Sequence, residues 1–147
     1  MPGCNVFNRE QQMLLVHFFG TVTANDLESQ AVSVLTNPDF NNSTRELISF
    51  AEVDGFAPDV DMEKLAEVTT AQKKQLEKFP EIKIAFLAPG SLAFNLALVY
   101  KTLVDSEDFN NEIGLFTDRH EAVSWLGGSP SEWDQLLDRI SKFCSLG

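Results

Sequence analysis

Few side chains in this sequence are placed to carry out chemistry. His17 lies inside an apolar run at residues 13–19, and we interpret it as a core or edge histidine rather than a ligand or base. His120 has no i, i+4 relation to His17, so the two do not form the helical pair that binds metal ions. Ser91 follows a Pro-Gly turn, not the Gly-x-Ser-x-Gly pattern of a nucleophile. We predict no catalytic residue, no metal site and no cofactor, and we expect that the protein is not an enzyme.

Polar side chains follow four apolar runs that have the length and composition of strands. In an open parallel sheet, ligands bind beyond the carboxyl ends of the strands, and helix N-termini gather there. We therefore predict that a set of ligand-binding residues lies at the end of the sheet where the carboxyl ends of the parallel strands meet. Its members are Thr21, Asp54, Ser91 and Asp118.

Phe56 stands out in the same region because it sits in a Gly- and Pro-containing stretch, residues 54–58, which we expect to be a loop. A large aromatic side chain there has two interpretations. It either anchors a protein partner or packs back onto its own domain and fixes the loop there. We retain it as a candidate partner-binding residue.

The elements that would position these residues alternate between strand and helix. Apolar strand patterns occur near residue 5 and at residues 13–19, 47–50, 82–88 and 113–116. Helix patterns begin after Thr23, after Asp59 or Asp61, at Ser91 and after Asp118, and a last one begins after Ser129. The sequence predicts an α/β fold with a mostly parallel five-stranded sheet, one antiparallel edge strand and four helices, plus an extra C-terminal helix. We expect one domain over residues 1–147, with residues 129–147 as an appended helix.

The helix expected at residues 92–104 is apolar on two sides. Leu92, Leu96, Val99 and Leu103 share a stripe that should face the sheet, while Phe94 and Leu98 point the other way. The last helix has its own apolar stripe, formed by Trp133, Leu136, Leu137, Ile140 and Phe143. Three arrangements remain open. The last helix could cover Phe94 and Leu98 within one chain, the patches could form a homodimer interface, or a ligand cleft could lie between the two helices.

Charge and composition exclude several function classes. The chain of 147 residues has 22 acidic and 11 basic side chains, a net charge of −11, which disfavours binding to nucleic acid or to an anionic membrane surface. Nothing resembles a signal peptide or a membrane span. The two cysteines, Cys4 and Cys144, lie far apart in the sequence, and we expect free thiols and a cytoplasmic protein.

Acidic residues are concentrated between positions 39 and 67. This segment contains eight acids against two bases, Arg45 and Lys64. The acids are Asp39, Glu46, Glu52, Asp54, Asp59, Asp61, Glu63 and Glu67. We expect a protein partner that docks at this end to be basic or apolar.

Three stretches resemble the STAS domain, specifically its SpoIIAA-like branch. They are GTVTANDL at residues 20–27, VLTNPDF at 34–40 and IGLFTDRHEAVSWL at 113–126, and the resemblance spans about residues 5–126. It implies a small cytoplasmic protein that works by binding. Phosphorylation-controlled members carry a serine just after the third strand, where residues 53–61 here contain neither serine nor threonine.

The resemblance implies a non-enzymatic protein-binding or signalling module, and the missing serine implies that it lacks the phosphoserine switch. The apolar patches described above add the expectation of a homodimer. The same branch is compared with lipid-transfer folds. The alternative is therefore a carrier of a small apolar, lipid-like ligand.

Overall fold

The computed structural model describes residues 3–105 and 112–144, apart from the side chains of residues 71–76, 104–105 and 143–144. Its elements follow the predicted order of strands and helices. The strands are β1 (Gly3–Asn8), β2 (Met13–Val22), β3 (Arg45–Phe56), β4 (Lys83–Leu87) and β5 (Glu112–Phe116). The helices are α1 (Ala24–Leu35), α2 (Met62–Lys78), α3 (Ser91–Asp105), α4 (Arg119–Leu126) and α5 (Pro130–Cys144).

The five strands form one sheet in the order β1-β2-β3-β4-β5. β1 is antiparallel to β2, and every other neighbouring pair is parallel. This confirms the predicted fold class. The parallel pairs follow from the sequence because each is joined by a helical crossover. Among the described residues, no helix combines the length and apolar character that crossing a bilayer requires.

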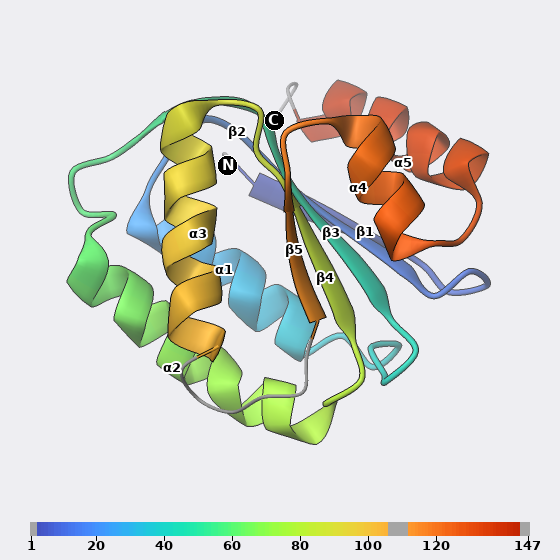
Figure 1. The fold of residues 1–147 in the computed structure, drawn as a ribbon, viewed down its shortest axis with the longest axis horizontal. Helices are drawn as coiled ribbons and strands as arrows, with labels where there is room; N and C mark the ends of the chain where they lie inside the picture. The colour runs from blue at the N-terminus through green and yellow to red at the C-terminus, as the bar shows by residue number, and fades with distance from the viewer. Residues whose placement is uncertain (1–2, 106–111, 145–147) are drawn as a thin grey trace.

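Helices cover both faces of the sheet, with α1, α2 and α3 on one side and α4 and α5 on the other (Figure 1). Two apolar clusters fill the spaces between these layers. Alternate residues of β2 serve both clusters: Leu14 and Val16 point to the α1 side, while Met13 and Leu15 point to the α5 side. A strand buried on both faces is apolar at nearly every position, which explains the continuous run at residues 13–19.

Two helices, α1 and α4, begin where the sequence predicts, directly after their capping residues. Thr23 caps α1 in a reciprocal box, in which its hydroxyl accepts from the Asp26 N–H and Asp26 accepts from the Thr23 N–H. Asp118 caps α4 by accepting a hydrogen bond of 3.0 Å from the Glu121 N–H. Side-chain oxygens at these positions satisfy backbone donors that have no partner within the helix.

The predicted loop at residues 54–58 is wrong in its first half, because β3 continues to Phe56. β2 is also longer than predicted. It passes through Gly20, whose positive φ of 65° marks a local shift in register, and reaches Val22. Thr21 and Val22 then pair with Gly55 and Phe56. The irregularity at Gly20, a conformation that glycine adopts without strain, lets the two strands extend together.

Candidate functional site

The four predicted ligand-binding residues lie at one edge of the sheet, as parallel strands require. Thr21 and Asp54 lie near the ends of β2 and β3, Ser91 is the first residue of α3, and Asp118 precedes α4. All four are exposed, and none of them lines the apolar cavity described below. Asp118 is engaged as a helix cap. A ligand role for this set stays a prediction.

Phe56 packs onto its own domain. Its side chain is half-buried against the α1-side cluster, and its ring meets that of Phe50 edge-on at a centroid distance of 5.9 Å. This arrangement matches the second interpretation, in which the Phe56 ring packs onto its own domain. A partner could contact only the part of the ring that remains exposed.

The predicted orientation of α3 is wrong by about one residue. Ala93, Ala97 and Tyr100 are buried against the sheet, whereas Leu92 is 59% exposed. The two alanines let the helix backbone approach the sheet closely, and Tyr100 meets Phe86 edge-on at 5.3 Å. Packing of these small and aromatic residues therefore outweighs burial of the leucine stripe.

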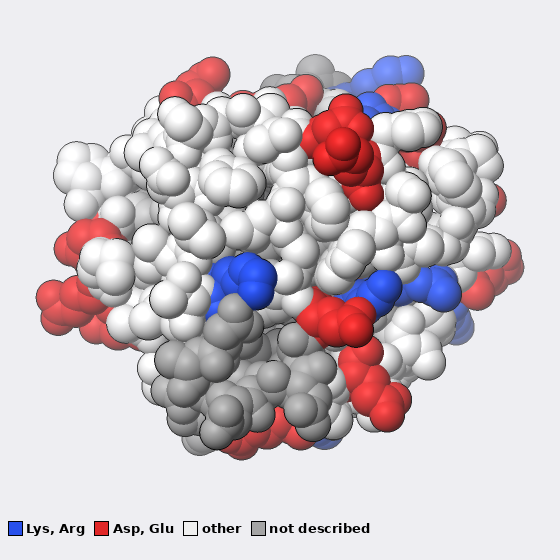
Figure 2. Space-filling model, in the orientation of Figure 1, with Lys and Arg blue, Asp and Glu red and all other residues white. Residues whose placement is uncertain are grey.

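The predicted partner-binding residues of α3 differ in exposure. Leu98 is 45% exposed and Leu92 is 59% exposed, about 120° apart around the helix axis. The exposed Asn95 lies between them, and we call this solvent-facing side of α3, from Leu92 across to Leu98, the α3 outer face. Phe94 is half-buried and packs against the α1-side cluster. The surface over α3 is mostly uncharged, whereas acidic side chains gather near the start of α2 (Figure 2).

The last helix does not cover Phe94 and Leu98. α5 packs against β1, β2 and α4, on the opposite side of the sheet from α3 (Figure 1). Its apolar stripe fills the second cluster through Trp133, Leu136, Leu137 and Ile140, while the Phe143 side chain lies outside the described set. Two of the three arrangements that the sequence left open are therefore excluded: coverage of α3 by α5 within one chain, and a ligand cleft between these two helices. The sheet provides a larger apolar surface for α5 than one helix face does.

The expectation of free thiols is also wrong. Cys4, in β1, is disulfide-bonded, and the sequence has one other cysteine, Cys144, with which α5 ends. Separation in the sequence says nothing about distance in space. α5 folds back against β1, so helix and strand from opposite ends of the sequence lie in contact.

His17 is a buried histidine with an acidic partner. It is 1% exposed, and its Nε2 lies 2.8 Å from Oε2 of Glu52. Its Nδ1 has no hydrogen-bond partner among the described residues. The interpretation of His17 as a core histidine agrees with this burial. Sequence spacing did not reveal Glu52 as its partner, because β3 extends further than predicted.

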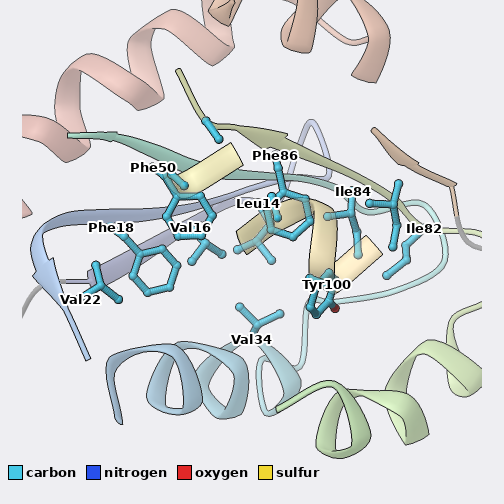
Figure 3. Close-up of a cluster of buried hydrophobic side chains, with 14 of the residues drawn as sticks. Leu14, Val16, Phe18, Val22, Val34, Phe50, Ile82, Ile84, Phe86 and Tyr100 are labelled. Atoms are coloured by element: carbon cyan, nitrogen blue, oxygen red, sulfur yellow. The ribbon is translucent and has the colours of Figure 1, made fainter. Parts of the chain in front are cut away.

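An apolar cavity of about 80 Å³ lies between the sheet and helices α1, α2 and α3. Val16, Ile48 and Ile84 line it from the strands, and Val34 and Leu65 from the helices. Figure 3 shows Val16 and Ile84 directed toward the helices, Val34 directed back toward the sheet, and Tyr100 in the same layer. An apolar cavity of this kind accepts small apolar groups more readily than water.

Glu46 is the one acidic residue among those that line this cavity in the described part of the chain. It is only 6% exposed, and burial raises the pKa of its carboxyl from the ordinary 4.5 to about 7. Burial also raises the pKa of the Tyr100 hydroxyl, and the nearby Glu46 charge adds to that rise. Glu46 belongs to the acidic segment that we expected to face a partner, but the structure places it in the core.

Sequence reasoning missed Glu46 although a signal was present. Glu46 is in phase with Ile48 and Phe50 in β3, and residues two apart on a strand point to the same face. An acidic residue in phase with core residues of a strand covered on both sides indicates a buried carboxyl.

The chain shows similarity to proteins of known structure. No protein-family model matches the chain, and no curated protein matches it significantly. The chain is similar to an uncharacterized protein of the DUF3478 family with a SpoIIAA-like fold from Shewanella loihica PV-4. The identity is 21% and the TM-score 0.49, over 85% of this chain and 94% of that one. It is also similar to the anti-sigma factor antagonist SpoIIAA in its unphosphorylated form. There the identity is 9% and the TM-score 0.47, over 86% of this chain and 99% of that one.

Proposed function

We propose that this chain is a non-enzymatic protein-binding or signalling module that forms a homodimer through the α3 outer face. The observation that carries the proposal is the exposure of two large apolar side chains on α3, Leu92 at 59% and Leu98 at 45%. No charged residue occurs between Ser91 and Tyr100. Exposed apolar side chains on an uncharged helix face are typical of a protein contact.

A second copy of this chain is the partner that best fits the charge. Each copy carries a net charge of −11, so two copies repel each other over most of their surfaces. The α3 outer face is mostly free of that repulsion (Figure 2). A two-fold axis beside α3 would place the same leucines of both copies against one another.

Control of this module does not use a phosphoserine at the usual place. The chain has no serine or threonine from residue 50 to residue 68, the stretch that includes the end of β3 and the start of α2. Asp54 supplies an exposed negative charge there without modification. We propose that a partner binds at the end of β3 constitutively, without control by phosphorylation.

Size-exclusion chromatography with light scattering tests the dimer. We expect a mass of about twice the 16.4 kDa of one chain, and a monomer for Leu98→Asp. Val32→Asp is the matched control, because Val32 is 58% exposed on α1 and has the same apolar character. A wild-type monomer, or equal loss of the dimer in both variants, would overturn the proposal. Phe94 is less suitable for this test because its half-buried ring also supports the core.

The apolar cavity favours a second candidate function, a carrier of a small apolar ligand. Its volume of about 80 Å³ is roughly half that of the cavity that holds benzene in an engineered protein, so the ligand would be small. Native mass spectrometry of freshly purified protein would show added mass on the chain. A bare chain that also takes up no added apolar probe would contradict this function.

A further inference from the structure

We propose that the cavity beneath α1 binds a small apolar amine, whose ammonium group pairs with the Glu46 carboxylate and whose hydrocarbon part lies among the aliphatic side chains. This inference rests on the second candidate function, the ligand carrier, and adds the chemical class of the ligand. It is independent of the dimer.

Glu46 lies at a position in the sheet that is apolar on both sides. Glu46 lies in the central strand β3, and its neighbours in register are Leu14 on β2 and Ile84 on β4. Both neighbours belong to the apolar cluster on the α1 side. The Glu46 residue lines the cavity and is only 6% exposed, so it is more than nine-tenths buried. An acid at such a position is costly unless a partner compensates it.

The protein supplies no such partner for Glu46 among its described residues. Glu46 has no hydrogen bond or ion pair with any of them. Among the described residues of α1 and α2 that line the cavity, the polar one is Gln30, whose side-chain oxygen accepts from Asn5, and the others are apolar. Tyr100 faces it from α3 and adds a hydroxyl but no positive charge. No lysine or arginine lines the cavity among the described residues.

A positively charged ligand suits this carboxylate best. An ammonium group supplies both a positive charge and N–H donors, so it compensates a buried carboxylate more completely than a neutral hydroxyl does. A carboxylate ligand would meet Glu46 as a like charge. The net charge of −11 also raises the local concentration of cations near the protein. The site therefore favours amines over alcohols, and alcohols over carboxylates.

The size of the cavity selects the probes. With a volume of about 80 Å³ against roughly 150 Å³ for a benzene site, the cavity holds an apolar group of about three or four carbon atoms. Butylamine, butanol and butyrate form a matched series that differs mainly in the head group. Methyl NMR of the full chain reports binding directly, because Ile84 and Val34 line the cavity.

We expect butylamine to shift the Ile84 and Val34 methyl signals saturably. Its binding should be about tenfold tighter at pH 8 than at pH 6, because the ionised fraction of Glu46 rises by about that factor. Butanol should bind more weakly and without this pH dependence, and butyrate should bind least. In Glu46→Gln the preference for butylamine should disappear while butanol binding remains. Glu10→Gln, an exposed change in the β1–β2 turn, should behave as wild type.

The outcomes separate this inference from the function on which it rests. If butanol and butylamine bind equally and Glu46→Gln changes neither, the role of Glu46 is overturned while the carrier function stands. Tighter binding of butyrate than of butylamine would overturn it as well. If no probe shifts the cavity methyls in the folded wild type, both the inference and the carrier function fail.

Discussion

Replacing Glu46 by glutamine should remove a pH-dependent loss of stability. The folded protein raises the pKa of this carboxyl from 4.5 to about 7, so between these values the folded state holds a proton that the unfolded chain has lost. The free energy of unfolding therefore falls as pH rises through this window and levels off above about pH 7. At about 1.4 kcal/mol for each pH unit, the full loss over this shift of the pKa is about 3.5 kcal/mol, of which about 2.5 kcal/mol develops between pH 5 and pH 8.

Urea unfolding of wild type and Glu46→Gln at pH 5 and pH 8 measures this effect. The stability of the variant relative to wild type should increase by about 2.5 kcal/mol over that range. All other titrating groups cancel in the comparison, and the cost of burying the amide is the same at both pH values. Glu10→Gln serves as the exposed control and should show no such change. If the difference between Glu46→Gln and wild type is the same at pH 5 and pH 8, the carboxyl is not held in an apolar environment and the reasoning is wrong.

Three further changes test other parts of the structure. Cys4→Ser, or reduction of the wild type, should lower the free energy of unfolding by about 2–5 kcal/mol in urea titrations, and identical midpoints with and without reductant would contradict the disulfide. Gly114→Ala should cost about 1–3 kcal/mol because the new methyl would lie 2.6 Å from the Phe116 ring, whereas Gly55→Ala meets nothing within 4 Å and should unfold close to wild type. Asp26→Ala removes the α1 capping box and should cost about 1–2 kcal/mol in thermal unfolding followed by circular dichroism, and an unchanged transition would show that the cap is dispensable.

Local patterns in the sequence were sufficient for the order of the elements and for several helix starts. Thr23 and Asp118 cap their helices as predicted, because capping depends on residues only three positions away. Crossover geometry then made the sheet mostly parallel. The same reasoning placed Thr21 and Asp54 at one edge, since the carboxyl ends of parallel strands share an edge.

The sequence by itself thus determined the fold class, the succession of strands and helices along the chain, and the end of the sheet where the polar residues gather, because these follow from local periodicity and chain connectivity. Tertiary structure alone decided which side of α3 faces the sheet, where α5 packs and that Cys4 is disulfide-bonded. These features depend on which apolar surfaces, far apart in the chain, come into contact. A local sequence pattern does not show which of the possible contacts is the most stable. The cavity at Glu46 belongs to the same group: the strand phase pointed the carboxyl inward, but only packing left it facing an apolar space without a partner among the described residues.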